Sequence, residues 1–368
     1  MSTESPREKI RKLARGKNGF GFCCSAMICM KREGTQATRE LIRKYREEKD
    51  FERATKRSLK LTEEERVKQR ADSKKGPVFS IAVPLYNTPE DFLREMVRSV
   101  CGQSWERWEL LLADGSDDGI NRESIVYEAV ECDQSKMGRK EPLNVSSAFI
   151  RHWRQPAKRP PSHIRYKKLE RNGGISRNSN AALEMAEGEY IVLLDHDDLL
   201  IPSALWEIGR AIRETGADFL YSDEAVFASP EPEKILEIHR KAEYSQEALL
   251  RSNYICHVTA FRRELLQGVG GFREEYDGSQ DHDLFLRLTD AAEKVVHIPK
   301  ALYFWRSHEG SVAGSIRAKD YAVDAGQRAV RDFLLERKGI KAEVVSSEEC
   351  ETIYEIRVTE DGGKNNGR

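Results

Sequence analysis

The stretch GEYIVLLDHDDLLIPSAL, residues 188–205, decides the fold predicted for this chain. Its apolar run, residues 190–194, contains no alternating polar side chains, so it predicts a strand buried on both faces, as in a parallel sheet between helices. Three aspartates and a histidine follow this run, and Pro202 then favours the first turn of a helix. An acidic loop therefore follows the carboxyl end of a buried strand, where α/β sheets bind their ligands.

The acidic loop suggests a divalent-cation site. Asp195 and Asp197 are two residues apart, so in an extended segment both side chains point the same way and can converge on one point. Converging carboxylates repel one another unless a proton or cation lies between them, and Mg²⁺ or Mn²⁺ takes oxygen ligands of this kind. An Asp-x-Asp pair also occurs in solvated turns, so both interpretations stay open on this motif alone.

Outward from this stretch the sequence alternates strand and helix patterns. Before it, strands are expected at residues 78–83, 108–112 and 164–169, and helices at 90–101, 124–130 and 178–186. After it, helices are expected up to residue 215 and at 320–337, and strands at 218–222, 254–261, 295–298 and 302–305. We also expect an irregular segment at 228–247 and a hairpin formed by residues 341–345 and 353–358. This order is typical of βαβ units and predicts an α/β fold with a mostly parallel central sheet flanked by helices.

The chain divides into three predicted regions. Residues 1–76 form a basic, helical N-terminal extension, residues 77–318 form the α/β body, and residues 319–368 add a helix, the hairpin and a disordered tail. Within the body, residues 131–163 are polar, contain four prolines and predict a surface insertion.

The net charge of −1 conceals an asymmetry between these regions. Residues 1–76 contain 22 Lys and Arg against 12 Asp and Glu, whereas the remainder contains 39 against 50. A basic arm suggests an anionic partner, either membrane lipid or nucleic acid. Its apolar island, residues 19–30, is too short to cross a bilayer, but its basic flanks predict peripheral membrane contact through residues 1–32. The alternative is a helix face that packs on the body.

The seven cysteines have irregular spacing, without paired C-x-x-C motifs. They indicate neither a disulfide framework nor a zinc site, so a reducing compartment is favoured. The apolar island also lacks the cleavage pattern of a signal peptide. We therefore expect a cytoplasmic protein that contacts the inner face of the cytoplasmic membrane through its basic arm.

Further acids follow predicted strands or begin a predicted helix, namely Asp114, Asp223 and Asp281. Because strand ends in a parallel sheet collect at one edge, several of these acids can share a cleft with the acidic loop. Asp281 differs, since Ser279 is expected to cap a helix and leave Asp281 in its first turn, where the helix dipole favours an ionised carboxylate. Such a group can act as a general base, although acids are common at helix starts.

Polar residues near these ends are candidates for binding a nucleotide. Tyr86 and Asn87 follow the first strand and can contact a base and a ribose, and Asp114 can accept a hydrogen bond from either. Turn formation is the alternative role of such residues. Arg306 and His308 can approach a diphosphate from late in the chain, although a single histidine is more often structural.

With these residues in place, the chain resembles family 2 glycosyltransferases, which have the Rossmann-like α/β fold called GT-A. The resemblance covers residues 77–316 and rests on seven stretches in the family's order: SIAVPLYN, LLADGSDD, RNGGISRNSNAALEMAEGEYIVLLDHDDLL, DFLYSDE, SNYICHVTAFRREL, GVGGFREEYDGSQDHDLFLRL and HIPKALYFWRSHEGS. It looks closest to bacterial members that build O-antigen and other surface polysaccharides, including rhamnosyltransferase-like ones.

The resemblance implies inverting transfer of a sugar from a UDP-, dTDP- or GDP-linked donor to a hydroxyl of a glycan or lipid-linked acceptor, with Mn²⁺ or Mg²⁺ as cofactor. By position it implies that Asp281 deprotonates the acceptor. The metal ligands that we assign on this basis are Asp195, Asp197 and His308. The donor-binding residues are Pro84, Tyr86, Asn87, Asp114, Asn172, Arg177, Asp195 and Arg306.

The sequence departs from the family pattern at two of these motifs. Ala113 stands where many members have a second aspartate, which leaves the nucleotide undefined. Gln280 stands where many have glutamate, although the following aspartate is kept. The N-terminal extension and residues 131–163 lie outside the resemblance.

Three other functions stay open. A nucleotidyltransferase that makes activated sugars would also use carboxylate-bound Mg²⁺, but PLYNTPED lacks the Gly-rich basic loop usual after its first strand. A non-catalytic module that binds a nucleotide or glycan would not need the acids that are all present here. The only feature that favours nucleic-acid binding is the positive charge of the N-terminal extension, so no specific nucleic-acid partner is expected.

Overall fold

The computed structural model describes residues 19–135, 163–308 and 316–359. The chain forms two compact units, Met1–Arg57 and Ser58–Arg368. Helix α2 (Gly19–Ser58) makes up the described part of the first unit and ends at the boundary. None of the helices in the described ranges is both long and apolar enough to span a bilayer. The predicted surface insertion at 131–163 and the predicted tail lie largely outside the described residues.

The second unit begins earlier than the boundary expected at residue 76. Helix α3 (Glu63–Ser73) belongs to it and begins with a capping box between Thr62 and Glu65. The buried Arg66 guanidinium donates to the carbonyl of Gly102, 2.9 Å away. Composition did not indicate a boundary at residues 57 and 58, because α3 is rich in charged residues like α2, although it packs on the body.

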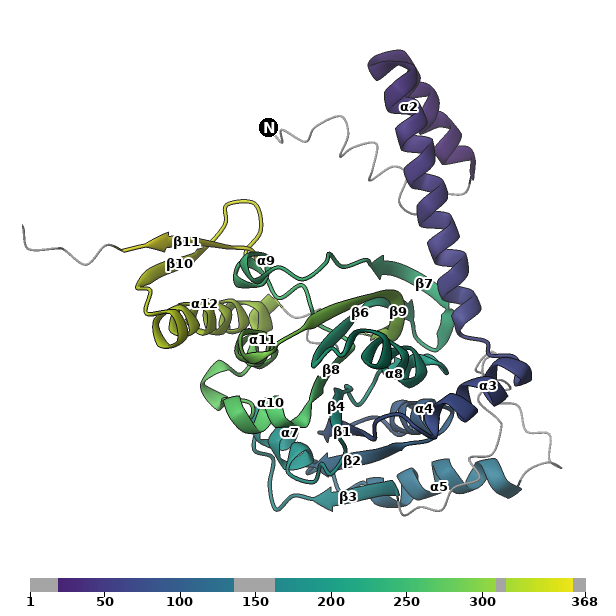
Figure 1. Cartoon of the computed structure of the whole chain (residues 1–368), viewed down its shortest axis with the longest axis vertical. Coiled ribbons are helices and arrows are strands. Elements are labelled where there is room, and N and C mark those ends of the chain that lie inside the picture. Colours follow the sequence, from purple (N-terminus) through teal and green to yellow (C-terminus); the bar gives the residue numbers. More distant parts are fainter. Residues whose placement is uncertain (1–18, 136–162, 309–315, 360–368) are drawn as a thin grey trace, which may run out of the picture. The chain divides into compact units, whose positions relative to one another are not determined.

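A nine-stranded sheet forms the centre of this unit, in the order β3-β2-β1-β4-β8-β6-β9-β5, with β7 paired to the outer part of β6 (Figure 1). Its strands are β1 (Phe79–Leu85), β2 (Trp108–Asp114), β3 (Ile164–Lys168), β4 (Tyr190–Leu193), β5 (Leu199–Leu200), β6 (Phe219–Ala228), β7 (Glu231–His239), β8 (Thr259–Arg262) and β9 (Val295–Ser307). The half that contains β3, β2, β1 and β4 is parallel, as predicted. Strand β8 then lies antiparallel to both β4 and β6.

Helices cover both faces of the sheet, which explains why its strands lack polar alternation. All seven residues of β1 are buried, and they alternate between two apolar clusters, with Ile81 in one and Ala82 in the other. The first cluster includes side chains of α4 (Glu90–Cys101), α5 (Arg122–Ser135) and α8 (Ala204–Thr215). The second includes side chains of α7 (Ile175–Leu183), α9 (Gln246–Arg251), α11 (Gln280–Ala291) and α12 (Ile316–Lys338).

Three expectations about the later strands are wrong. The strand expected at 254–261 begins only at Thr259. Residues 228–247 are not irregular, because β6 continues to Ala228 and β7 pairs with it antiparallel. The strands expected at 295–298 and 302–305 are one strand, β9, which runs beside β6 with register shifts at Asp223. Strand β7 was not predicted because it pairs only with β6 and most of its residues are at least partly exposed, with Ile235 and Ile238 as its apolar contacts to the core.

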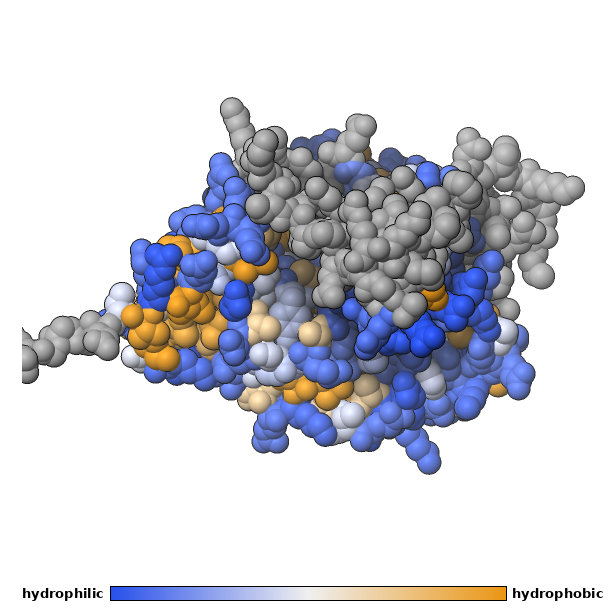
Figure 2. Space-filling view, turned by 90° about the horizontal axis from the view of Figure 1, so that it is seen from above, coloured by the Kyte–Doolittle hydropathy of each residue, from blue (hydrophilic) through white to orange (hydrophobic). Residues whose placement is uncertain are grey.

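The C-terminal helix and hairpin pack beside the sheet. Strands β10 (Ala342–Ser346) and β11 (Tyr354–Val358) pair antiparallel, which confirms the predicted hairpin. Apolar side chains gather on the surface of this region (Figure 2), where Leu335, Ile340 and Val358 are exposed. Helix α10 (Arg263–Val269) and the short 3₁₀ helix η2 (Glu274–Tyr276) lead from β8 into α11.

Candidate active site

The acidic loop turns back on itself after β4. The strand ends at Leu193, and the Asp198 amide donates to the Asp195 carbonyl, 3.3 Å away. Asp195 Oδ2 lies 3.3 Å from His257 Nε2, whereas Asp197 Oδ2 lies 2.9 Å from His308 Nε2. The two carboxylates therefore contact different histidines. The chain turns at residues 196–197, so the segment is not extended as expected, and convergence of both carboxylates on one cation stays a prediction.

Strand β9 holds this loop from one side. In the β5–β9 ladder, Leu199 pairs with Phe304, which brings the end of β9 beside the aspartates. Asp198 is buried and accepts hydrogen bonds from the Tyr303 hydroxyl at 2.6 Å and from the Arg306 amide at 2.7 Å. Burial, followed by the charges of neighbouring aspartates, raises the pKa of Asp198. This aspartate therefore anchors the loop and is not exposed to a ligand.

Arg306 supports the same loop from beneath, which corrects the expectation that it binds the donor diphosphate. Its side chain is 0% exposed, and Nε donates to the Asp197 carbonyl at 2.5 Å. Its guanidinium lies 2.8 Å from Glu95 Oε2 and over the rings of Phe92 and Phe227, at 4.4 and 4.9 Å. All of these partners belong to the protein interior.

We expect Arg306→Met to lower the free energy of unfolding without a specific loss of donor binding. The change leaves the buried Glu95 carboxylate without its cation and removes the support of Asp197, so a loss of about 3–5 kcal/mol in the free energy of unfolding is expected. Urea denaturation measures it. Arg94→Met, on the exposed side of α4, is the control and should change stability little, because its ion pairs with Glu90 and Glu128 are at the surface. A stable Arg306→Met protein with weakened donor binding would restore the original expectation.

Asp197 Oδ2 and His308 Nε2 lie 2.9 Å apart, at hydrogen-bond distance, and the assignment of both side chains as metal ligands stays a prediction. Adjacent ligands of an octahedral ion with bonds of about 2.1 Å lie about 3 Å apart, close to the 2.9 Å between Asp197 Oδ2 and His308 Nε2. Both side chains are about one-fifth exposed, so other ligands can reach an ion there. Within the ranges that the structure describes, no third His, Cys, Asp or Glu completes a metal cluster, so the remaining ligands would come from substrate or water.

Asp281 lies in the first turn of α11 and shares the site with the acidic loop. Ser279 does not cap this helix as expected, since its hydroxyl donates to the Ala322 carbonyl instead. Burial, followed by repulsion from the Asp195 carboxylate, raises the pKa of Asp281 to about 6, while the charge of His257 opposes this rise. The start of α11 is thus within the range over which the Asp195 charge acts on Asp281, and the role of Asp281 as the base stays a prediction.

His257 and Glu224 belong to this site and were missed from the sequence. Strand β8 runs antiparallel to β4 and β6, so the segment before β8 lies beside the carboxyl end of β4 and the middle of β6. His257 thereby reaches Asp195 with Nε2 and Glu224 with Nδ1, at 3.3 and 3.2 Å. Burial disfavours the imidazolium, but both carboxylates outweigh it and hold the pKa of His257 well above its usual range. The sequence signals were the matched stretches DFLYSDE and SNYICHVTAFRREL, which contain Glu224 and His257, and the position of Glu224 two residues after the strand predicted at 218–222.

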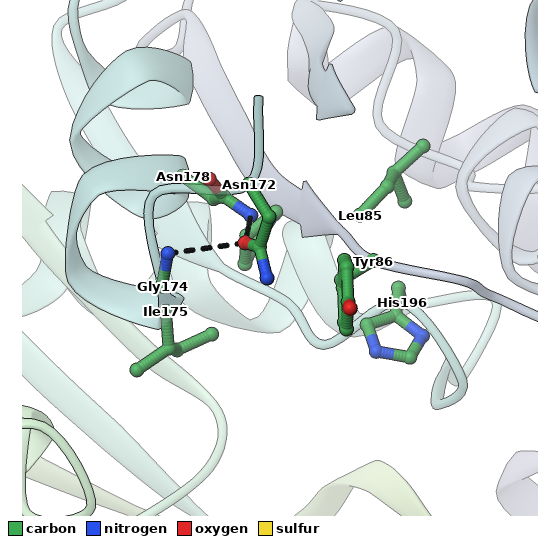
Figure 3. A pocket seen from close by; sticks show the side chains of 8 residues that line it. Leu85, Tyr86, Asn172, Gly174, Ile175, Asn178 and His196 are labelled. Carbon is green, nitrogen blue, oxygen red and sulfur yellow. Dashed lines mark hydrogen bonds between the residues drawn. The ribbon is translucent and has the colours of Figure 1, made fainter. Parts of the chain in front are cut away.

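A hollow near the end of β1 contains three of the predicted donor-binding residues, Pro84, Tyr86 and Asn172. His196 lies beside Tyr86 in this hollow (Figure 3). Asn172 Oδ1 accepts hydrogen bonds from Gly174 N and Asn178 Nδ2, both at 3.0 Å. Figure 3 shows the amide nitrogen of Asn172 pointing away from these bonds. The hollow thus combines an exposed aromatic ring with an oriented amide.

The remaining predicted donor-binding residues lie around this hollow with protein partners. Asn87 joins the loops after β1 and β2 through hydrogen bonds to Ser116 and Asp117. Arg177 is exposed and paired with Glu274 at 2.5 Å. Nucleotide contact by Asn87 and Arg177 stays a prediction.

Asp114 is fully buried near the same hollow. It accepts hydrogen bonds from the Ser116 amide, the Tyr166 hydroxyl and the Lys168 ammonium. Burial opposes ionisation, but these donors lower the pKa of Asp114 overall. Contact with a nucleotide, as the resemblance implies, would require Tyr166 or Lys168 to release an oxygen, and it stays a prediction. Asp223, the other strand-end acid, is buried against His297 and the Lys241 amide, so it does not join the cleft.

Comparison with known proteins supports this description. Residues 80–133 and 146–270 match the sequence model of the family described as Glycosyl transferase family 2. The uncharacterized protein y4gI of Sinorhizobium fredii is 36% identical over 281 residues, which are 73% of this chain and 27% of that protein. The O-antigen biosynthesis protein RfbC of Myxococcus xanthus is 32% identical over 278 residues, 73% of this chain and 19% of that protein. The chain therefore spans only a minor part of the length of these relatives.

Two solved structures share the fold. Mannosyltransferase PcManGT from Pyrobaculum calidifontis, in complex with GDP-Man and Mn²⁺, is similar over 71% of this chain and 66% of its own, with a TM-score of 0.50 and 19% identity. S. aureus TarS 1-349, in complex with UDP-GlcNAc, is similar over 70% of this chain and 66% of its own, also with a TM-score of 0.50 and 19% identity.

Proposed function

Because the chain belongs to glycosyl transferase family 2 and has the GT-A fold, we propose that it transfers a sugar from a nucleotide-sugar donor to a hydroxyl of an acceptor, with inversion at the anomeric carbon. The observation that carries this proposal is the grouping of Asp195 with His257 and of Asp197 with His308 at the carboxyl end of β4, and the effect of the Asp195 charge on Asp281 supports it. A base, a carboxylate and a cation-binding pair at one site suit displacement of a diphosphate by an alcohol.

The donor would extend from the hollow to the acidic loop. Tyr86 offers a ring for stacking against a base, and the oriented amide of Asn172 offers a hydrogen-bond donor to a base carbonyl. Those features suit the nucleotides that the two solved structures hold, which are GDP-Man and UDP-GlcNAc. His196 connects the hollow to Asp195 and Asp197, so the diphosphate would lie next to these carboxylates.

Asp197 and His308 would hold Mn²⁺ or Mg²⁺ beside that diphosphate. When bound, the cation supplies positive charge that stabilises the leaving nucleoside diphosphate. Without it, the carboxylates of Asp195 and Asp197 would face an anionic donor. The loop is held in position by Arg306 and Tyr303, so these residues keep Asp197 aligned with His308.

Asp281 would take the proton of the acceptor hydroxyl as its oxygen bonds to the anomeric carbon and the bond to the diphosphate breaks. A pKa of about 6 leaves this carboxylate mostly ionised at neutral pH, yet more basic than an ordinary aspartate. That combination suits a general base. Attack from the face opposite the leaving group inverts the anomeric configuration.

The acceptor that we propose is a glycan or lipid-linked glycan in surface polysaccharide synthesis. The relation to RfbC of Myxococcus xanthus, an O-antigen biosynthesis protein, supports this class. We place the protein in the cytoplasm, with contact to the inner face of the membrane through its basic N-terminal extension. Binding to anionic vesicles would test this contact, since 22 Lys and Arg lie in residues 1–76.

A nucleotide sugar should raise the melting temperature in the presence of Mn²⁺. A ligand at about 100 times its Kd stabilises the folded state by about 2.7 kcal/mol, which corresponds to roughly 5 °C for a unit of this size. A thermal-shift screen of UDP-, dTDP- and GDP-sugars, each with Mn²⁺, Mg²⁺ or EDTA, measures this effect. Formation of pyrophosphate from a sugar phosphate and a nucleoside triphosphate by the protein would instead indicate a nucleotidyltransferase. Donor binding without transfer or hydrolysis would indicate a non-catalytic module.

A further inference from the structure

Glu224 is a buried carboxylate next to the site that the proposed reaction does not use. Its side chain is 2% exposed and sits at the end of the β6 segment that pairs with β8. His239 Nδ1 lies 2.8 Å from Oε1, while Oε2 accepts from Lys241 Nζ at 3.1 Å and from the His257 amide at 3.1 Å. The imidazole Nδ1 of His257 is also 3.2 Å from Oε2. Burial of these charged groups costs desolvation free energy, which suggests that their arrangement has a function.

These contacts leave the His257 ring little freedom. Besides Glu224, the Lys241 ammonium donates to the carbonyls of Ile255 and His257, which fixes the backbone around the ring. The ring stacks on Tyr303, with 4.6 Å between centroids and 15° between planes. Its Nε2 points to Asp195 Oδ2, at 3.3 Å. Glu224 therefore acts on Asp195 through one immobilised imidazole.

The carboxylates of Asp195 and Asp197 have different surroundings and different histidine partners. The charge of Asp195 acts on Asp281, the predicted base. Asp197 is instead paired with His308. In the proposed reaction the transferred sugar lies between the base and the diphosphate. Asp195 is 49% exposed, whereas Asp197 is 21% exposed and paired with His308, so Asp195 is the loop carboxylate more accessible to that sugar.

We propose that Glu224 and His257 are positioning residues for the sugar of the donor: they fix the direction of the Asp195 carboxylate, so that it contacts a sugar hydroxyl while Asp197 and His308 hold the cation. This inference rests on the proposed function and divides the acidic loop into two roles. It predicts that loosening Asp195 weakens recognition of the sugar and leaves recognition of the nucleoside diphosphate unchanged.

Asp223 provides a matched control on the neighbouring residue of β6. It is as buried as Glu224, at 1% exposed, and it too contacts a histidine, His297 Nε2, at 2.8 Å. It also accepts from the Lys241 amide at 2.8 Å. The partners of its carboxylate are thus His297 and the Lys241 backbone, whereas those of Glu224 include His257. A general loss of stability would affect both variants, whereas an effect on Asp195 would appear only for Glu224.

The test compares Glu224→Gln, His257→Gln and Asp223→Asn with the wild-type protein. Calorimetric titration in Mn²⁺ measures the Kd of UDP and GDP and of UDP-GlcNAc, GDP-Man and any further sugar nucleotide selected by the thermal-shift screen. Partners that orient a ligating side chain contribute about 10- to 100-fold, so both Gln variants should weaken sugar-nucleotide binding by this factor. Their Kd for the matching nucleoside diphosphate should stay within twofold of wild type, and Asp223→Asn should bind both ligands normally.

The outcomes separate this inference from the proposed function. Failure of the wild-type protein to bind any sugar nucleotide removes both. Normal wild-type binding, with both Gln variants equal to wild type for both ligands, overturns only the positioning role. Equal weakening of both ligands also overturns it, since Glu224 would then support the whole donor site. His257→Gln guards against misfolding of the Glu224 variant, because it leaves the contact between Glu224 and Lys241 in place.

Discussion

Asp281→Asn is expected to reduce sugar transfer by about 10²- to 10⁴-fold, the usual contribution of a general base. The asparagine amide has nearly the same shape as the carboxylate, so the start of α11 should be unchanged, but it cannot take the acceptor's proton. Donor affinity, measured by titration in Mn²⁺, should stay close to wild type because Asp197, His308 and the hollow at β1 are untouched. Asp290→Asn, at the other end of α11, is the control and should retain wild-type turnover.

The same variant should change the pH dependence of stability. The pKa of Asp281 is raised in the folded protein to about 6, so the stability that its protonated form contributes is complete below its ordinary value of 3.8 and is lost as the pH rises through 6. Asparagine does not titrate. The free energy of unfolding of Asp281→Asn relative to wild type should therefore rise between pH 4 and pH 8, by on the order of 2 kcal/mol. Thermal melts at both pH values measure this difference.

Two results would remove Asp281 from the reaction. One is a wild-type rate in Asp281→Asn, which would show that another group accepts the proton. The other is a stability difference that does not depend on pH, which would mean that Asp281 titrates like a solvated aspartate. Loss of donor binding together with turnover would instead place Asp281 in contact with the donor.

The sheet could be predicted where burial alone determines the sequence. Strands β1 and β2 are buried at all seven positions, so they are mostly apolar without regular polar alternation, and the helix between them has one apolar face. Strand β7 could not be found in this way, because most of its residues are at least partly exposed and its pairing with β6 replaces burial. The local sequence pattern indicates how far a strand is buried, but it does not indicate which strand is its partner.

The same limit applies to the site. Asp281 and Asp197 were predictable, because one begins a helix and the other follows a buried strand. The contact of His257 with Asp195 depends on β8 being inserted antiparallel between β4 and β6, and no residue in β8 indicates this placement. Arg306 was assigned to the diphosphate for the corresponding reason: its charge was visible, but its enclosure by Phe92, Phe227 and Glu95 was not.

Asp197→Ala is expected to remove the gain in donor affinity that Mn²⁺ provides. In the wild type this gain should be on the order of 100-fold, about 2.8 kcal/mol, because the cation neutralises charge between the diphosphate and the acidic loop. Removal of one of the two protein ligands leaves only His308 to hold the ion, so donor affinity in Mn²⁺ should fall to the value measured in EDTA. Titrations of the same donor in both conditions give this ratio directly.

The comparison between Asp197→Ala and His308→Ala decides whether the pair acts as a unit. Both variants lose the 2.9 Å contact between the two side chains, so each should lose most of the Mn²⁺ effect, and the double variant should lose little more. Asp324→Ala, an exposed aspartate paired with Arg328 on α12, controls for the loss of a negative charge. Full Mn²⁺ dependence in Asp197→Ala would place the cation elsewhere, and Asp195 would then be the first residue to examine.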